Sequence, residues 1–380
     1  MKTIIFDYVS TGHHIEYLHH LYIGASQQKC KEYIFLLPKT FEENRNKLEW
    51  PKAENIRFVY HNHDVVTPNP LILLKNTIHM IKTINHVCKK YNANRVFFIS
   101  LIEFFIAIPL LLSSNIKASG IIYDIYLYKW KNSSFKSKIL YCLKFLCLSK
   151  SQKIEKVMVL NDVNSANIFN RKYKTNKFVY LPDPYVPIID TNEYYSEILQ
   201  IKFNNKIVIA HIGAMDSRKG TLLILKSIVK AGILYKNLYF IFAGKVMPDI
   251  REEFYRLLSQ IEDKSNIIVK DYFCSYNEIA QICKVSNYIL APYSIVNRSS
   301  GMLGYASQFS VPLIVPDSGL IGKLVKRYQL GVTIKDTSID GIIECLSKIK
   351  KTQSYKVSSR YCKDNNIDVF NSLILKEYLV

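Results

Sequence analysis

The stretch VIAHIGAMDSRKGTLLILKSIVKAG (208–232) decides the fold. It begins with an apolar run that is typical of a buried strand and then turns at Gly213. From Lys219-Gly220 it continues into a pattern that is typical of a helix. A strand that hands over to a helix through a glycine-containing turn indicates a parallel sheet. The free N–H groups and partial positive charge at the start of such a helix favour binding of a diphosphate.

Two further turns follow in the same half of the chain. LYFIFAGKV (238–246) predicts a second strand that ends at Gly244. YILAPYSIVNRSSGMLGYASQFSVPLIVPDSG (288–319) predicts a strand that breaks at Pro292, followed by a Ser-Ser-Gly turn that opens a helix. The carboxyl ends of parallel strands lie on one edge of a sheet, where ligands collect. Together the three turns predict a pocket for a nucleotide diphosphate.

This order of turns resembles the donor-binding half of the GT-B glycosyltransferases, a large group that uses nucleotide sugars. Gly213 and Lys219-Gly220 match the glycine and the Lys-Gly of the first turn in that group. Ala306 and Pro312 match the Ala and Pro of its Glu-Ala-x4-Gly-x-Pro signature. The resemblance implies a nucleotide-diphosphate sugar of UDP or GDP type as donor substrate, and no other cofactor.

The sequence also departs from that group. Its retaining members usually carry two glutamates, and the matching positions here are Asn297 and Tyr305. The arginine that often follows the first glycine is Ala214, although Arg218 can reach the same phosphates from beside Lys219. Catalysis by the usual glutamates is therefore in doubt. Diphosphate binding is still expected, because it depends on backbone amides and one or two cations.

The predicted donor site combines backbone turns, cations and an aromatic surface. Ser299 and Ser300 can cap the helix that begins near Gly301 while facing a phosphate, and helix capping alone is an equal alternative for each. Tyr272 and Phe273 offer a stacking surface for the base, with ordinary packing at a strand end as the alternative. The predicted donor-binding residues are Gly213, Arg218, Lys219, Gly244, Tyr272, Asn297, Ser299, Ser300 and Gly301. No acidic pair of DxD type follows a strand in the right place, so no metal site is predicted.

A chain of 380 residues with 49% hydrophobic residues is long enough for two cores. Strands alternate with helices along the first half, which favours a doubly wound parallel sheet. The segment PDPYVP (182–187) interrupts this pattern with three prolines and predicts a hinge. We therefore expect an α/β protein of GT-B type, with two doubly wound Rossmann-like domains facing a cleft. The predicted domains are an acceptor-binding domain at 1–183 and a nucleotide-sugar-binding domain at 184–366.

The strands expected in the first half are rich in β-branched and aromatic residues. They are 3–9, 32–38, 55–61, 95–100, 119–126, 156–161 and 177–182. The GT-B resemblance implies that a final helix, 367–380, returns to pack on the first domain. We expect Phe370, Leu373, Ile374, Tyr378 and Leu379 to make that contact.

The first domain should supply the proton acceptor. STGHHIEY (10–17) follows the first strand, and its His13 and His14 titrate near neutral pH. Glu103 and Asp124 are expected at strand ends on the same edge, and GT-B enzymes often place a catalytic carboxylate or histidine there. We predict Asp124 or Glu103 as the base ahead of His13, with a structural role as the alternative for each.

The chain carries 51 basic and 31 acidic residues, a net charge of +20 that attracts polyanions. No zinc finger, RNP motif or helix-turn-helix pattern accompanies this charge, so nucleic acid is not predicted as a partner. A Lys- and Asn-rich composition is the alternative explanation. Neither a signal peptide nor a spanning apolar run is recognised, and the cysteines follow no zinc spacing. These features predict a cytoplasmic protein with reduced thiols.

One basic segment suggests a place in the cell. KWKNSSFKSKILYCLKFLCLSK (129–150) combines an apolar stripe with a fringe of lysines. Basic amphipathic helices of this kind lie on anionic membrane surfaces, here the inner face of the cell membrane. A helix that packs on the core and turns its lysines to water is the alternative.

Together these features predict an enzyme that moves a hexose-type sugar to a saccharide acceptor, free or lipid-linked, in cell-surface polysaccharide synthesis. Two alternatives stay open. One is a nucleotide-sugar epimerase of similar fold. The other is a GT-B-like protein that has lost catalysis and serves as a binding or scaffold protein.

Overall fold

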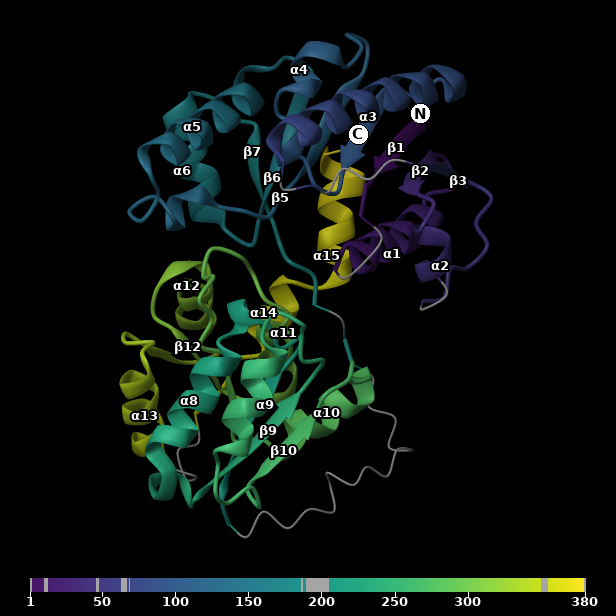
Figure 1. Cartoon of the computed structure of the whole chain (residues 1–380). Coiled ribbons are helices and arrows are strands. Elements are labelled where there is room, and N and C mark those ends of the chain that lie inside the picture. Colours follow the sequence, from purple (N-terminus) through teal and green to yellow (C-terminus); the bar gives the residue numbers. More distant parts are fainter. Residues whose placement is uncertain are drawn as a thin grey trace. The chain divides into compact units, whose positions relative to one another are not determined.

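The computed structural model describes residues 2–9, 13–45, 48–62, 67, 69–185, 187–188, 205–349 and 355–378. The chain divides into two compact units (Figure 1). The N-terminal unit comprises Met1–Pro184 together with Asn366–Val380, and the C-terminal unit comprises Tyr185–Asn365. The last segment of the chain therefore belongs to the unit that the first segment builds.

The N-terminal unit is built on a seven-stranded parallel sheet with the order β3-β2-β1-β4-β5-β6-β7. Because β1 and β4 are neighbours, the strand order reverses between them. The strands are β1 (Lys2–Phe6), β2 (Glu32–Pro38), β3 (Ile56–His61), β4 (Arg95–Phe98), β5 (Lys117–Ile122), β6 (Ile154–Leu160) and β7 (Phe178–Leu181).

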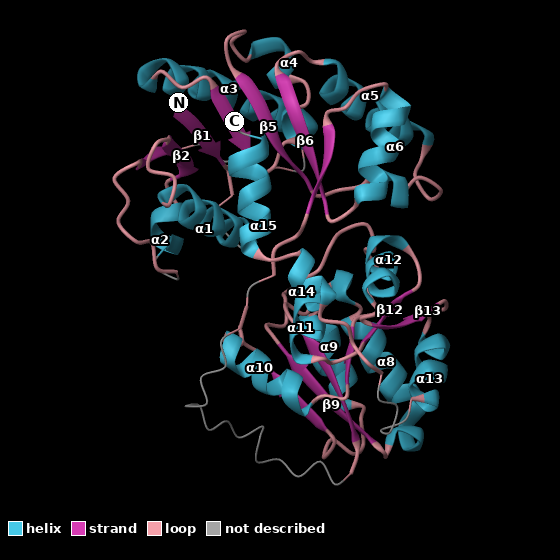
Figure 2. Cartoon of the chain, turned by 180° about the vertical axis from the view of Figure 1, so that it is seen from behind, coloured by secondary structure: helices cyan, strands magenta, loops and turns pink. Residues whose placement is uncertain are grey.

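Helices cover this sheet, and the returning C-terminal segment contributes to one face (Figure 2). Phe370 and Ile374 are fully buried in the same core cluster as Ile5, Leu18 and Phe35. The described helical elements are α1 (His13–Ser26), α2 (Phe41–Arg45), α3 (Pro70–Tyr91), η1 (Ile102–Phe104), α4 (Ala107–Leu111), η2 (Tyr126–Tyr128), α5 (Phe135–Lys150), α6 (Val163–Tyr173), α15 (Ile367–Ser372) and the π-helical η5 (Leu373–Tyr378).

The C-terminal unit repeats this plan with a six-stranded parallel sheet of order β10-β9-β8-β11-β12-β13. The strand order reverses between β8 and β11. The strands are β8 (Ile207–Ile212), β9 (Leu238–Ala243), β10 (Ile267–Lys270), β11 (Tyr288–Leu290), β12 (Leu313–Pro316) and β13 (Gly331–Ile334). The helical elements are η3 (Ser217–Lys219), α8 (Thr221–Ala231), η4 (Gly232–Tyr235), α9 (Arg251–Ser259), α10 (Tyr276–Val285), α11 (Met302–Phe309), α12 (Gly319–Tyr328), α13 (Ile339–Lys348) and α14 (Arg360–Asp364).

The predicted α/β class with two doubly wound parallel sheets is confirmed. The strand predicted at 32–38 has those bounds as β2. The strand predicted at 119–126 is wrong at its end, because β5 stops at Ile122 and Asp124 lies beyond it. The last predicted helix is α-helical only to Ser372 and continues as η5.

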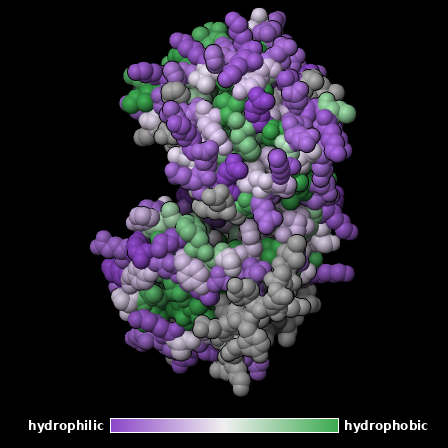
Figure 3. All heavy atoms as spheres, turned by 90° about the vertical axis from the view of Figure 1, so that its right-hand side faces the viewer, coloured by the Kyte–Doolittle hydropathy of each residue, from purple (hydrophilic) through white to green (hydrophobic). Residues whose placement is uncertain are grey.

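Figure 3 shows one face, on which hydrophilic side chains cover most of the described surface and hydrophobic side chains gather in smaller areas. No helix among the described residues is long and apolar enough to cross a membrane.

His211 is a buried polar group that ties the central strands of the C-terminal unit together. Its Nδ1–H donates to the carbonyl oxygen of Leu290 at 2.9 Å, and its Nε2 accepts from the Thr221 hydroxyl at 2.8 Å. The ring thereby joins β8, β11 and the start of α8 while it is neutral. Burial, assisted by the charge of nearby Lys219 and opposed by the hydrogen bond to Leu290, lowers the pKa of His211 to about 4.

This geometry predicts a pH dependence of stability. The unfolded chain binds a proton at His211 below about pH 6.5, whereas the folded state resists it until about pH 4. The unfolded state therefore binds more protons in this window, and stability falls as pH falls. Protonation of this histidine in the unfolded chain should lower the free energy of unfolding by about 2 kcal/mol between pH 7 and pH 5.

Urea unfolding of the wild type and of His211→Gln at both pH values measures this contribution. The variant should lose less stability than the wild type between the two pH values. Equal losses in the two proteins would contradict the assignment.

Candidate functional site

The topology marks one place in each unit where a ligand can lie. In a doubly wound sheet, ligands bind beyond the carboxyl ends of the strands, where the strand order reverses. In the C-terminal unit this place lies after β8 and β11, and in the N-terminal unit after β1 and β4. All predicted site residues except Tyr272, which follows β10, come from segments that follow these strands or their immediate neighbours.

Two glycines bring the first turns of the C-terminal unit together. Gly213 has φ +105° and Gly244 has φ +143°, conformations that other residues rarely adopt. A Cβ on Gly244 would lie 2.1 Å from the carbonyl oxygen of Gly213. The two backbones therefore touch, and beyond them Met215 and Val246 continue the parallel pairing of β8 and β9. The turn after β8 is open on its other side, because a Cβ on Gly213 would meet only Lys219 Nζ, at 3.6 Å.

Lys219 links the loops after β8 and β11. Its ammonium lies 3.1 Å from the Tyr293 hydroxyl and 4.6 Å from the centre of the Tyr293 ring. The same hydroxyl lies 3.1 Å from Ser300 Oγ, and Ser294 N–H donates to the carbonyl of Arg218 at 3.0 Å. Lys219 is thereby fixed beside Gly213 and Ser300. Sequence reasoning missed Tyr293, because a single tyrosine after Pro292 carries no distinctive pattern.

Arg218 has a protein partner in this structure. Asp216 Oδ1 accepts from the backbone N–H groups of Arg218 and Lys219, at 2.9 and 3.1 Å. Asp216 Oδ2 accepts from Arg218 Nε at 2.9 Å, so the guanidinium folds back on its own turn. Its side chain stays 53% exposed, which leaves room for reorientation toward an anion. Sequence reasoning did not anticipate this pair, because Asp216 gives no signal beyond a helix-capping residue.

The Ser-Ser-Gly turn opens α11, with Gly301 rather than a serine at the N-cap. Ser300 is buried, and its Oγ accepts from the Met302 N–H at 3.4 Å. Gly301 is exposed, and nothing lies within 4 Å of where its Cβ would be. Asn297, which stands where the resemblance has a glutamate, is only 2% exposed.

The aromatic pair predicted for the nucleotide base lies beyond β10. Tyr272 and Phe273 are 44% and 76% exposed, so packing at a strand end does not account for them. The Tyr272 hydroxyl donates to Glu278 at 2.6 Å and accepts from Lys270 Nζ at 2.9 Å, which holds the ring in place. Lys245, directly after Gly244, is a cation that the sequence analysis did not include; its Nζ lies 3.4 Å from Asp271.

In the N-terminal unit, a buried carboxylate and a histidine meet after β1. Asp7 is fully buried, and its Oδ1 accepts from the N–H groups of Tyr8 and Val9 at 2.8 and 3.2 Å. Its Oδ2 lies 2.8 Å from Nδ1 of His14, in the first turn of α1. A carboxylate can only accept here, so His14 Nδ1–H donates and the neutral ring keeps Nε2 as an acceptor. A base oriented by a buried carboxylate is a recurring catalytic arrangement.

Tyrosines pack around this pair. The Tyr123 ring lies 5.6 Å from His14 and 6.0 Å from the parallel ring of Tyr17. The Tyr123 hydroxyl is buried and has no hydrogen-bond partner among the described residues. Burial raises the pKa of Tyr123 well above its usual range, and the charges of Asp7 and Asp183 raise it further. The Tyr123 hydroxyl beside His14 therefore stays protonated at neutral pH.

The three residues predicted as catalytic have different surroundings. Asp124 Oδ2 accepts from Lys129 Nζ at 2.7 Å, in the loop after β5. Glu103, in η1, accepts from the Ser100 hydroxyl at 2.8 Å, and its charge helps to raise the pKa of the buried Tyr8. His13 begins α1, but its side chain and residues 10–12 lie outside the described residues.

No cluster that could hold a metal ion is found among the described side chains. No family model matches the chain, and no curated protein matches it.

Solved structures match it over nearly their whole length. Sucrose-phosphate synthase from Thermosynechococcus elongatus has a TM-score of 0.71 at 12% identity, covering 100% of this chain and 98% of that one. HepE from Anabaena, in complex with UDP and glucose, has a TM-score of 0.67 at 13% identity, covering 99% and 98%. A Listeria monocytogenes protein described as a UDP-N-acetylglucosamine 2-epimerase has a TM-score of 0.62 at 12% identity, covering 98% and 94%. These likenesses establish that the chain has the GT-B fold.

Proposed function

We propose that this protein is a glycosyltransferase that moves a sugar from a nucleotide-diphosphate sugar to a hydroxyl group of a saccharide acceptor. The observation that carries the proposal is the fixed placement of Lys219 beside the open turn at Gly213. Similar folds support it, since HepE was solved with UDP and glucose. The C-terminal unit would bind the donor, and the N-terminal unit would activate the acceptor.

Donor binding is expected at the turns after β8 and β11. Gly213 allows a diphosphate to approach the backbone closely, and Lys219 supplies a positive charge next to it. The backbone N–H groups at the start of α11, beside Ser300 and Gly301, add donors of the same kind. Tyr272 and Phe273 offer faces on which the base can stack.

The same groups would assist departure of the nucleotide. When the bond between sugar and diphosphate breaks, negative charge grows on the leaving phosphate oxygen. Preorganised cations and N–H groups stabilise such charge, and here they are Lys219, Arg218 and the turn at Ser299–Gly301. Arg218 must leave Asp216 to take part, and its exposed guanidinium allows this. The proposal needs no metal ion for this step.

His14 is the base that the geometry favours. Asp7 holds its Nδ1, so that Nε2 can accept a proton from an acceptor hydroxyl while Asp7 stabilises the resulting imidazolium. Asp124 and Glu103 remain alternative proposals for the catalytic base. Asp124 is already paired with Lys129, so it must leave this partner to act as a base, and Glu103 accepts a hydrogen bond from the Ser100 hydroxyl.

Replacing both Arg218 and Lys219 with Ala should weaken UDP or GDP binding at least tenfold. Each charge-assisted bond contributes roughly 1.5–3 kcal/mol, so losing one or two has this effect. Calorimetry on the folded double variant measures it. Lys264→Ala is the matched control. This exposed lysine precedes β10 and so lies at the amino ends of the strands, whereas the donor turns follow the carboxyl ends. Unchanged affinity in the double variant would rule out the donor site.

Replacing the base or its orienting carboxylate should slow turnover strongly while donor binding persists. His14→Asn and Asp7→Asn should each lower the transfer rate about 10²–10⁴-fold, because removal of a general base or its orienting group has this effect. Asp124→Asn and Glu103→Gln, assayed alongside, should lower it less. Full activity of His14→Asn together with loss in Asp124→Asn or Glu103→Gln would move the role to that carboxylate.

We also propose that α5 places the enzyme on an anionic membrane, at the inner face of the cell membrane. The predicted apolar stripe faces outward: Phe135 is 78% exposed, and Ile139, Leu143 and Leu146 are 43–49% exposed. The buried side of the helix is formed instead by Phe145 and Leu148. Packing on the core therefore does not use the stripe, and the lysines around it match the charge of anionic lipids. A lipid-linked acceptor in cell-surface polysaccharide synthesis would fit this location.

Changing Lys136, Lys138 and Lys144 to Glu should release the protein from vesicles that contain anionic lipid. Each lysine near such a surface contributes about 1 kcal/mol, and each new glutamate is repelled. Co-sedimentation at low salt measures the bound fraction. The control changes three exposed lysines of the C-terminal unit, Lys236, Lys264 and Lys284, by the same charge. Wild-type protein that fails to bind such vesicles would contradict the membrane proposal.

Two alternatives to transfer remain, each with an observation behind it. The likeness to the Listeria epimerase favours nucleotide-sugar epimerisation, which would convert UDP-N-acetylglucosamine without any acceptor. Asn297 and Tyr305 at the positions of the two usual glutamates favour a protein that binds donors without turnover. Incubation with UDP-sugars, with and without saccharide acceptors, separates the three functions.

A further inference from the structure

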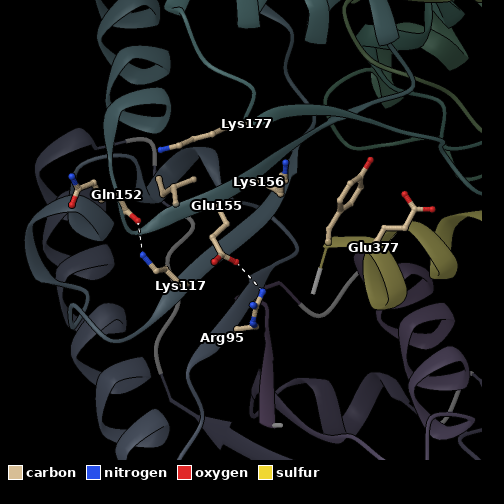
Figure 4. Close-up of a pocket in the computed structure, with 9 residues that line it drawn as sticks. Arg95, Lys117, Gln152, Glu155, Lys156, Lys177 and Glu377 are labelled. Carbon is tan, nitrogen blue, oxygen red and sulfur yellow. Dashed lines mark hydrogen bonds and ion pairs between the residues drawn. The ribbon is translucent and has the colours of Figure 1, made fainter. Parts of the chain in front are cut away.

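The N-terminal unit has a pocket at the edge of its sheet opposite to Asp7 and His14. It has a volume of about 640 Å³ and lies where β4, β5, β6 and β7 begin (Figure 4). Because the strands are parallel, their amino ends gather there, far from the carboxyl edge that carries the proposed base. The pocket has no part in the function proposed above.

Basic residues from four adjacent strands line this pocket. They are Arg95 and Lys117 at the starts of β4 and β5, Lys156 in β6, and Lys177 directly before β7. Arg95 and Lys117 are direct neighbours in the sheet register. Like charges at neighbouring positions destabilise a sheet unless an anion lies between them. The starts of these strands therefore hold a row of cations, and their mutual repulsion favours binding of an anion.

The protein supplies part of that negative charge. Glu155 accepts from Arg95 Nη1 at 2.9 Å, and Glu377 lines the pocket from the C-terminal helix. A register shift between Ala118 and Ser119 leaves Glu155 as the extra residue of β6. Such bulges re-aim a side chain. Four cations against two carboxylates still leave two positive charges in the pocket.

Helix capping explains two of the cations only in part. Lys117 Nζ donates to the carbonyl of Gln152 at 3.0 Å, and Lys177 Nζ donates to that of Ser151. Both carbonyls follow the end of α5, where cations are favourable. Even so, burial lowers the pKa of Lys177, and the nearby Lys117 and Lys150 lower it further. The cations are thus held together against their repulsion, and capping involves neither Arg95 nor Lys156.

We propose that this pocket binds a phosphate-bearing anion at a site separate from the nucleotide donor site. A phosphate monoester or diphosphate carries the two negative charges that balance the pocket, and its several oxygens suit lysine ammonium groups and the planar arginine fork. The phosphate can belong to a soluble metabolite or to the headgroup of a lipid. Glu377 and Tyr378 come from η5, so the ligand would join the C-terminal segment to the sheet.

Inorganic pyrophosphate is the probe for the soluble form, titrated calorimetrically into the Arg218→Ala, Lys219→Ala variant so that the proposed donor turn does not contribute. Adding Lys156→Gln and Lys177→Gln should weaken its binding at least tenfold. Glu377→Gln should tighten binding severalfold, because it removes an exposed negative charge. A misfolded variant cannot produce that opposite change.

Vesicles with and without phosphatidic acid test the lipid headgroup. Preferential binding to phosphatidic acid that is lost on adding Lys156→Gln and Lys177→Gln, with no pyrophosphate binding, would assign the pocket to a lipid. Pyrophosphate binding that follows the pocket charges would assign it to a soluble phosphate. Binding of neither probe, or binding that ignores all three substitutions, would overturn the proposal. UDP affinity of the otherwise wild-type pocket variants should be unchanged, which separates this site from the donor site.

Discussion

The contact between the backbones of Gly213 and Gly244 is the constraint on which the candidate donor site depends. A Cβ at Gly244 would lie 2.1 Å from the Gly213 carbonyl oxygen, and both residues have positive φ. Only glycine permits this approach without strain. It keeps the turn after β8 narrow and its outer side open beside Lys219. His211 helps to hold the same turn in place, because its neutral ring forms hydrogen bonds to Leu290 of β11 and to Thr221, the first residue of α8.

The sequence predicts those features that depend on local pattern. Runs of β-branched and aromatic residues locate the strands of both sheets, and the apolar stripe of α5 can be recognised as Phe135, Ile139, Leu143 and Leu146. Gly213, Gly244 and Lys219 are recognisable because strained turns and phosphate-facing helix starts require those residue types. The sequence alone, however, does not say which side of α5 packs inward. The inward side is defined by tertiary contacts, because Phe145 packs against Phe169 of α6 and Phe178 of β7.

Pairings between side chains are what the sequence does not provide. Asp7 is indistinguishable from an ordinary strand-end aspartate until α1 turns His14 back onto it. Asp124 looks like a strand-end base, but β5 stops at Ile122 and the loop brings Lys129 to its carboxylate. Arg218 looks free, although Asp216 caps the same turn and holds its guanidinium. Each case depends on loop geometry, for which residue type carries little information.

The central claim is that a nucleotide diphosphate binds at the turns after β8 and β11. Hydrogen–deuterium exchange of the whole chain, with and without saturating UDP or GDP, tests it most directly, because bound phosphates protect the backbone N–H groups that they contact. The account predicts slower exchange at residues 213–220 and 299–304, with little change at the amino edges of either sheet. Unchanged exchange in both turns, with a nucleotide bound elsewhere on the chain, would contradict it.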